Sequence, residues 1–211
     1  MLHPLVKLSQ MPLTLPYRQI LSRLGYSDQT KVPAQQLDLL TKQIQSAFAL
    51  ISPKGVYTCL AIANNDGQTV TLADHTQIAC PAVAKMLKNC QDVWLAAATI
   101  GEQTSELTAK YFAEGEGAAA TITDAVGSEC ADAVMDFLQT YAAAQLKRSG
   151  KILSDCRFSP GYGNWPLTAQ KDFFAWLDLQ ELGLTLNDSM LLIPEKSVTA
   201  LAGLKSSSRG L

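Results

Sequence analysis

The sequence is poor in the residues that usually bind metals. It has two histidines, His3 and His75, and five widely spaced cysteines without a Cys-x-x-Cys pair. Zinc sites and disulfide frameworks need several such ligands at short, regular spacings. The sequence therefore predicts no metal site, and it favours reduced, mostly buried thiols.

The sequence also lacks a basic excess and a long apolar run. Lys and Arg number 17 against 19 Asp and Glu, which gives a formal net charge of −2. Such a chain has no broad positive field to attract nucleic acid or an anionic membrane. The longest mostly apolar stretch, residues 93–100, is far shorter than the about 20 residues of a membrane helix. Because the start also lacks the pattern of a secretory signal, the expected location is cytoplasmic.

What is present is enough apolar sequence for a packed core. Hydrophobic residues make up 47% of the chain and charged residues 17%, so a disordered chain is excluded. Residues 1–15 are expected to form an extended arm, 205–211 a frayed tail, and 1–211 a single domain. Apolar spacing predicts helices at 17–24, 34–50, 81–89, 102–112 and 168–180 and strands at 56–63, 68–73, 92–100, 190–193 and 198–204. The predicted class is α+β, or mixed α/β.

The best-defined element is a long helix over residues 117–147. Asp124, Ser128, Asp132 and Asp136 follow at four-residue intervals, so they lie along one side of this helix. One interpretation is a solvated acidic face. The other is that one of these carboxylates lines a cleft and accepts a hydrogen bond from a ligand amine or hydroxyl.

Residues 150–166 are expected to form a loop of unusual composition. It contains the run Arg157-Phe158-Ser159-Pro160-Gly161-Tyr162-Gly163-Asn164-Trp165-Pro166. Glycine lets the backbone approach a ligand closely, aromatic rings can stack on a planar base, and an arginine can hold a carboxylate by two hydrogen bonds. These parts suit a small zwitterionic or nucleoside-like ligand. The alternative is a surface loop whose aromatics fill the core and whose arginine is solvated.

This run resembles the S-adenosylmethionine-binding motif in the reactivation domain of vitamin B12-dependent methionine synthase. Stand-alone bacterial relatives typically read Arg-Phe-Ser-Pro-Gly-Tyr-Gly-Asp there. Four further segments, among them Thr99-Ile100-Gly101, resemble the family in the same order, so that the similarity covers roughly residues 15–205. The other three are Leu24-Gly25-Tyr26, Ala125-Val126-Gly127-Ser128 and the closing stretch at 190–200.

The resemblance implies a fold and a binding site. The expected fold is a C-shaped α+β domain with a central, largely antiparallel sheet flanked by helices, one of them long. Arg157 would hold the methionyl carboxylate, and Tyr162 with the backbone of Pro160 and Gly161 would line the rest of the ligand. Asp132 falls where the large synthases place a ligand-contacting glutamate. No catalytic residue is expected, because methyl transfer from a sulfonium to cobalt moves no proton.

The resemblance also implies a function and partners. The chain would be a stand-alone activation subunit that binds S-adenosylmethionine and supports reductive remethylation of cobalamin. The cobalamin would be carried by a partner, a methionine synthase or another corrinoid protein, with a flavodoxin-like reductant as electron donor. Two alternatives remain open. One is a ligand-poor module that docks on a corrinoid protein, since Asn164 stands where the stand-alone relatives usually have Asp. The other is an unrelated small-molecule enzyme.

Overall fold

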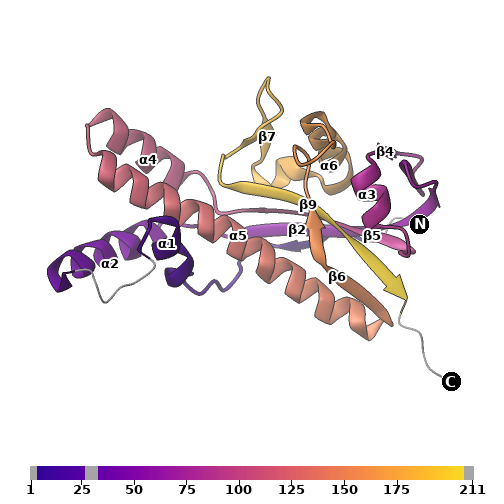
Figure 1. Ribbon diagram of the computed structural model, residues 1–211, viewed down its shortest axis with the longest axis horizontal. Coiled ribbons are helices and arrows are strands. Elements are labelled where there is room, and N and C mark those ends of the chain that lie inside the picture. Colours follow the sequence, from indigo (N-terminus) through magenta and orange to yellow (C-terminus); the bar gives the residue numbers. More distant parts are fainter. Residues whose placement is uncertain (1–3, 27–32, 207–211) are drawn as a thin grey trace.

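The computed structural model describes residues 4–26 and 33–206 and is built around an antiparallel sheet (Figure 1). The strand order is β4-β3-β2-β5-β9-β6, with β1 paired to β2, and β7 and β8 form a separate two-stranded sheet. The strands are β1 (Val6–Leu8), β2 (Lys54–Asn65), β3 (Thr69–Leu72), β4 (Gln77–Ala79), β5 (Asp92–Thr99), β6 (Lys151–Phe158), β7 (Thr185–Leu186), β8 (Leu192–Ile193) and β9 (Ser197–Ser206).

Helices cover both faces of this sheet (Figure 1). The helices are α1 (Tyr17–Arg23), α2 (Ala34–Phe48), α3 (Pro81–Met86), α4 (Gln103–Ala113), α5 (Gly117–Arg148) and α6 (Gln170–Leu177), with short 3₁₀ segments η2 (Leu167–Ala169) and η3 (Leu179–Leu182). In the described parts of the chain, no helix combines the length and the apolar character needed to cross a bilayer. The mixed class with an antiparallel sheet and one long helix is confirmed.

Side-chain alternation in β5 separates two hydrophobic cores. Trp94 and Ala96 pack with residues of α1, α2 and α5, whereas Val93 and Leu95 pack with residues of α3 and α6. Successive strand residues point to opposite faces, so a strand buried on both sides reads as an unbroken apolar run. Burial on both faces explains why residues 93–100 are mostly apolar, although strands of antiparallel sheets often expose one polar face to solvent.

The long helix packs closely on one face of the sheet. Ala96 of β5 pairs with Ala200 of β9, and both alanines belong to the core shared with α5. At Gly55 of β2, an added Cβ would lie 2.9 Å from Leu138 Cδ2 of α5. Small residues at these positions let the helix approach the sheet. The predicted helix over 117–147 is confirmed, with its end at Arg148.

The expected loop over 150–166 is wrong in its first half. Residues Lys151–Phe158 form β6, which lies at the edge of the sheet and has β9 as its one partner among the described strands. Its register shifts between Leu153 and Arg157, which indicates a bulge. Ser154 and Asp155 lie at this bulge, and polar residues there break the alternation by which a strand is found in a sequence. The first residues of the predicted frayed tail, Lys205 and Ser206, belong to β9, and 207–211 lie outside the described residues.

Other boundaries also differ from the predictions. The helix expected over 168–180 is divided into η2, α6 and η3. Asp178 adopts a left-handed φ of 51°, which ends α6 and separates it from η3. The helix expected over 81–89 ends at Met86, and the strand expected over 190–193 is confined to Leu192–Ile193. The predicted arm contains β1, which pairs with the start of β2, while residues 1–3 lie outside the described part.

Candidate functional site

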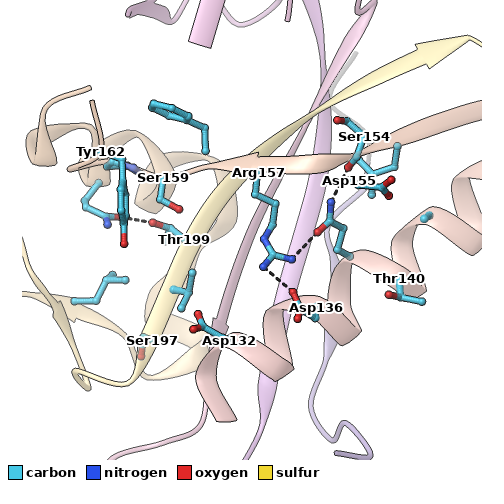
Figure 2. A pocket seen from close by; sticks show the side chains of 18 residues that line it. Asp132, Asp136, Thr140, Ser154, Asp155, Arg157, Ser159, Tyr162, Ser197 and Thr199 are labelled. Atoms are coloured by element: carbon cyan, nitrogen blue, oxygen red, sulfur yellow. Dashed lines mark hydrogen bonds and ion pairs between the residues drawn. The ribbon is translucent and has the colours of Figure 1, made fainter. Parts of the chain in front are cut away.

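A pocket of about 1080 Å³ lies between α5, β6, the loop that follows β6, and the start of β9. Its walls come from segments that are far apart in the sequence (Figure 2). The lining residues are Asp132, Asp136, Gln139, Thr140, Ala143, Leu153, Ser154, Asp155, Arg157, Phe158, Ser159, Pro160, Tyr162, Gln170, Leu192, Ser197, Val198 and Thr199.

Four of the five residues expected to bind a ligand line this pocket. They are Asp132, Arg157, Pro160 and Tyr162. Gly161 lies between two of them without lining the pocket itself, and its φ of +92° is a conformation that favours glycine. The tertiary structure thus brings the helix-borne acid and the glycine-aromatic loop to one hollow. Their roles in binding a ligand stay a prediction.

Arg157 is the central cation of the pocket, and its guanidinium has two partners on α5. Nη2 contacts Asp136 Oδ1 at 2.6 Å, and Nη1 donates a hydrogen bond to Gln139 Oε1, also at 2.6 Å. Figure 2 shows the side chain reaching from β6 toward the helix turns that carry Asp132 and Asp136. Because only 25% of the side chain is exposed, the guanidinium has a defined place in the pocket wall.

Gln139 was missed by the sequence reasoning. Its side chain is buried, and Nε2 donates a hydrogen bond of 2.6 Å to the carbonyl oxygen of Ser154 while Oε1 accepts from Arg157. One amide therefore connects α5 to the bulge of β6 and to the arginine. The available signal was spacing, because Gln139 follows Asp136 by three residues and so shares its side of the helix.

We expect Gln139→Ala to lower the free energy of unfolding by about 1–3 kcal/mol, since it removes the hydrogen-bond partner of two groups in a partly buried site. Urea unfolding followed by circular dichroism would measure the change. Gln45→Ala is the matched control, because Gln45 is an exposed residue of α2 and its replacement should change stability by no more than about 0.5 kcal/mol. Equal stability of the two variants would contradict the bridging role of Gln139.

The acidic stripe of α5 has two parts with different surroundings. Asp124 Oδ1 and Ser128 Oγ lie 2.6 Å and 3.1 Å from Nζ of Lys196, a buried lysine just before β9. Asp132 and Asp136 line the pocket instead. Asp124 and Ser128 therefore hold the residue just before β9 against α5. Asp132 and Asp136 are the members of the stripe that can contact a ligand in the pocket.

Asp132 is open to solvent but lies beside other carboxylates. Partial desolvation at the pocket wall, together with the negative charges of Glu129 and Asp136, raises its pKa, and Arg23 and Arg157 oppose this effect. A carboxylate in such a place is stabilised when a cation binds beside it, because the cation offsets the repulsion from its neighbours. Asp132 can therefore accept a hydrogen bond from a cationic ligand group.

The loop after β6 has one aromatic residue that fills the core and one that lines the pocket, so each interpretation of its sequence holds for one of them. Trp165 is only 3% exposed, and its ring lies between Phe158 and Phe173 at centroid distances of 6.2 Å and 5.9 Å. Tyr162, by contrast, is 69% exposed and lines the pocket. The Gly161 N–H donates to the Trp165 carbonyl oxygen at 2.9 Å, which closes the loop. One aromatic residue anchors the loop, and another is presented to the pocket.

The charged groups of the lining are mostly anionic. The charged lining residues are three aspartates, Asp132, Asp136 and Asp155, and one arginine, and the lining contains neither histidine nor cysteine. The pocket therefore offers one cation and an excess of anions. This combination suits a small ligand that carries both an anionic and a cationic group.

Comparison with solved structures shows which fold this is. The chain is similar to the crystal structure of the MetH reactivation domain bound to AdoHcy, with a TM-score of 0.66 at 14% sequence identity, over 99% of this chain and 81% of that one. No protein-family model and no curated protein sequence matches. The chain thus has the fold of the MetH reactivation domain, as the resemblance of its motifs indicated.

Proposed function

We propose that this chain binds S-adenosylmethionine in the pocket between α5, β6 and β9. In this proposal it is a cytoplasmic activation domain that supports reductive remethylation of cobalamin on a B12-dependent methionine synthase. The supporting observation is that four of the five residues expected to bind the ligand line one pocket, in a fold shared with a domain that was crystallised with AdoHcy.

The pocket suits the parts of this ligand. Arg157 would bind the carboxylate of the methionyl group, because a guanidinium forms charge-assisted hydrogen bonds with it. Asp132 would accept from the ammonium group, and the exposed ring of Tyr162 offers a face for the adenine. The volume of about 1080 Å³ is slightly above the usual range of about 300–1,000 Å³ for pockets that hold small molecules and cofactors, so the ligand has enough space.

The sparse chemistry of the pocket is compatible with methyl transfer. Displacement at a sulfonium needs orientation of the methyl group and access for the nucleophile, and it needs no general base. Cobalamin on the partner would supply the nucleophilic metal. The residues of this chain would bind the amino-acid end, leaving the methyl group accessible to the partner, and a flavodoxin-like protein would supply the electron.

Calorimetric titration tests the binding proposal. We expect saturable binding of one S-adenosylmethionine per chain. AdoHcy lacks the positive charge on sulfur, so in a pocket with excess carboxylates it should bind about two- to fivefold more weakly, as expected for one partly screened charge interaction. Absence of binding for both ligands would refute the proposal, and tighter binding of AdoHcy would contradict the charge argument.

A docking module that uses no ligand is the second candidate. The observation that favours it is the pairing of Arg157 with Asp136 and Gln139, which already engages both terminal nitrogens. The two candidates differ in one assay. If the chain binds a cobalamin protein but gives no methylcobalamin spectrum with reductant and S-adenosylmethionine, the docking module is correct.

A further inference from the structure

The two partners of Arg157 differ in burial, and this difference has a consequence if the proposed function holds. Gln139, which accepts a hydrogen bond from Nη1 of Arg157, is 8% exposed. It is itself held in place by its hydrogen bond to the Ser154 carbonyl oxygen. The side chain of Asp136, on Nη2, is 67% exposed. An exposed ion pair adds little stability and exchanges readily, whereas a buried hydrogen-bonded amide is costly to displace.

We propose that Asp136 occupies the carboxylate-binding position of Arg157 and that the carboxylate of the ligand replaces it. Gln139 acts as a positioning residue, which keeps the guanidinium in place during this exchange. Asp136 thereby favours ligands that carry their own carboxylate, because a ligand without an anionic group cannot replace it on the arginine.

The geometry of a guanidinium supports the exchange. A carboxylate binds it by two parallel hydrogen bonds, along either the edge of Nη1 and Nη2 or the edge of Nε and Nη2. Both edges include Nη2, the nitrogen that lies 2.6 Å from Asp136 Oδ1. Nη2 has two N–H groups, one on each edge. A ligand that binds with both oxygens therefore either takes the N–H that Asp136 holds or brings a second carboxylate next to Asp136, and like charges repel. Gln139 uses only Nη1, so the second edge stays available while Gln139 remains bound.

Competition of this kind lowers the apparent affinity for the ligand. The measured dissociation constant equals the intrinsic constant divided by the fraction of chains in which Arg157 is free. A second effect of Asp136 acts in the opposite direction, because its negative charge attracts the cationic groups of the ligand. The two effects separate when two ligands are compared that share their cations but differ in the carboxylate.

The test uses Asp136→Asn with S-adenosylmethionine and its decarboxylated form, which keeps the nucleoside, sulfonium and amine. Loss of the aspartate charge weakens the contacts of the shared cationic groups alike in both ligands, while loss of competition for Arg157 favours only the ligand with a carboxylate. We expect the preference for S-adenosylmethionine over the decarboxylated form to rise about two- to fivefold above the wild-type value. Asp38→Asn is the matched control, since Asp38 is an exposed helical acid paired with Lys42 at 2.7 Å, and it should leave the preference unchanged.

Each outcome of this comparison is decisive. A preference that stays constant or falls in Asp136→Asn, while wild type binds S-adenosylmethionine, overturns the exchange and leaves the proposed function intact. Failure of wild type to bind either ligand refutes the proposed function together with the exchange. For Gln139→Ala, we expect S-adenosylmethionine to lose more than fivefold in affinity and the decarboxylated form less than twofold. A merely structural role of Gln139 would weaken both ligands equally.

Discussion

Replacement of Trp165 with alanine is expected to lower the free energy of unfolding by about 3–5 kcal/mol, the usual cost of removing a buried tryptophan. The Trp165 ring is buried between Phe158 and Phe173 and fixes the loop after β6 to the core on the α3 and α6 side of the sheet. Without the ring, a large cavity would remain under the loop. Guanidinium-induced unfolding followed by circular dichroism measures the change.

Tyr162→Ala is the matched comparison in the same loop. Because the Tyr162 side chain is mostly exposed, its loss should change the stability by no more than about 0.5 kcal/mol. If the ring stacks on adenine, however, the affinity for S-adenosylmethionine should fall by about 1–3 kcal/mol, which corresponds to about 5- to 150-fold. Similar destabilisation by the two substitutions would contradict the division of the loop into an anchoring and a presented aromatic residue.

Arg157→Ala is expected to weaken S-adenosylmethionine binding about 10- to 150-fold. The estimate follows from the loss of about 1.5–3 kcal/mol for a hydrogen bond to a charged group. Arg157 is the one arginine among the lining residues, and the three charged residues that share the lining are aspartates. No neighbouring cation in the lining can therefore replace it. Calorimetry at constant ionic strength gives the change in dissociation constant.

Two further variants separate the geometry of Arg157 from its charge. Arg157→Lys keeps the positive charge but not the planar fork, so most of the affinity should still be lost. Arg148→Ala removes the same charge from an exposed position at the end of α5, and it should leave binding nearly unchanged. Thermal unfolding of each variant checks that it is folded. If Arg157→Ala and Arg148→Ala bind equally, Arg157 does not hold the carboxylate.

The regular elements were predictable because burial imposes a short-range pattern. The long helix expected over 117–147 and the mostly apolar strand expected over 92–100 each follow from residues within a few positions of one another. Edge strand β6 was missed because it is paired on one side only and bulged, so that Ser154 and Asp155 interrupt its pattern. Local spacing does not predict a strand whose place is set by its neighbour β9.

The sequence by itself determined the class of the fold and the residue types of the site. The run from Arg157 to Pro166 and the acid at Asp132 were recognisable from their chemistry and from their resemblance to a known motif. Only the tertiary structure decided which aspartates face the pocket, that Trp165 is an anchor, and that Asp136 and Gln139 share the arginine. These contacts depend on how α5 lies against the bulge of β6, and this arrangement is fixed by packing across the whole sheet.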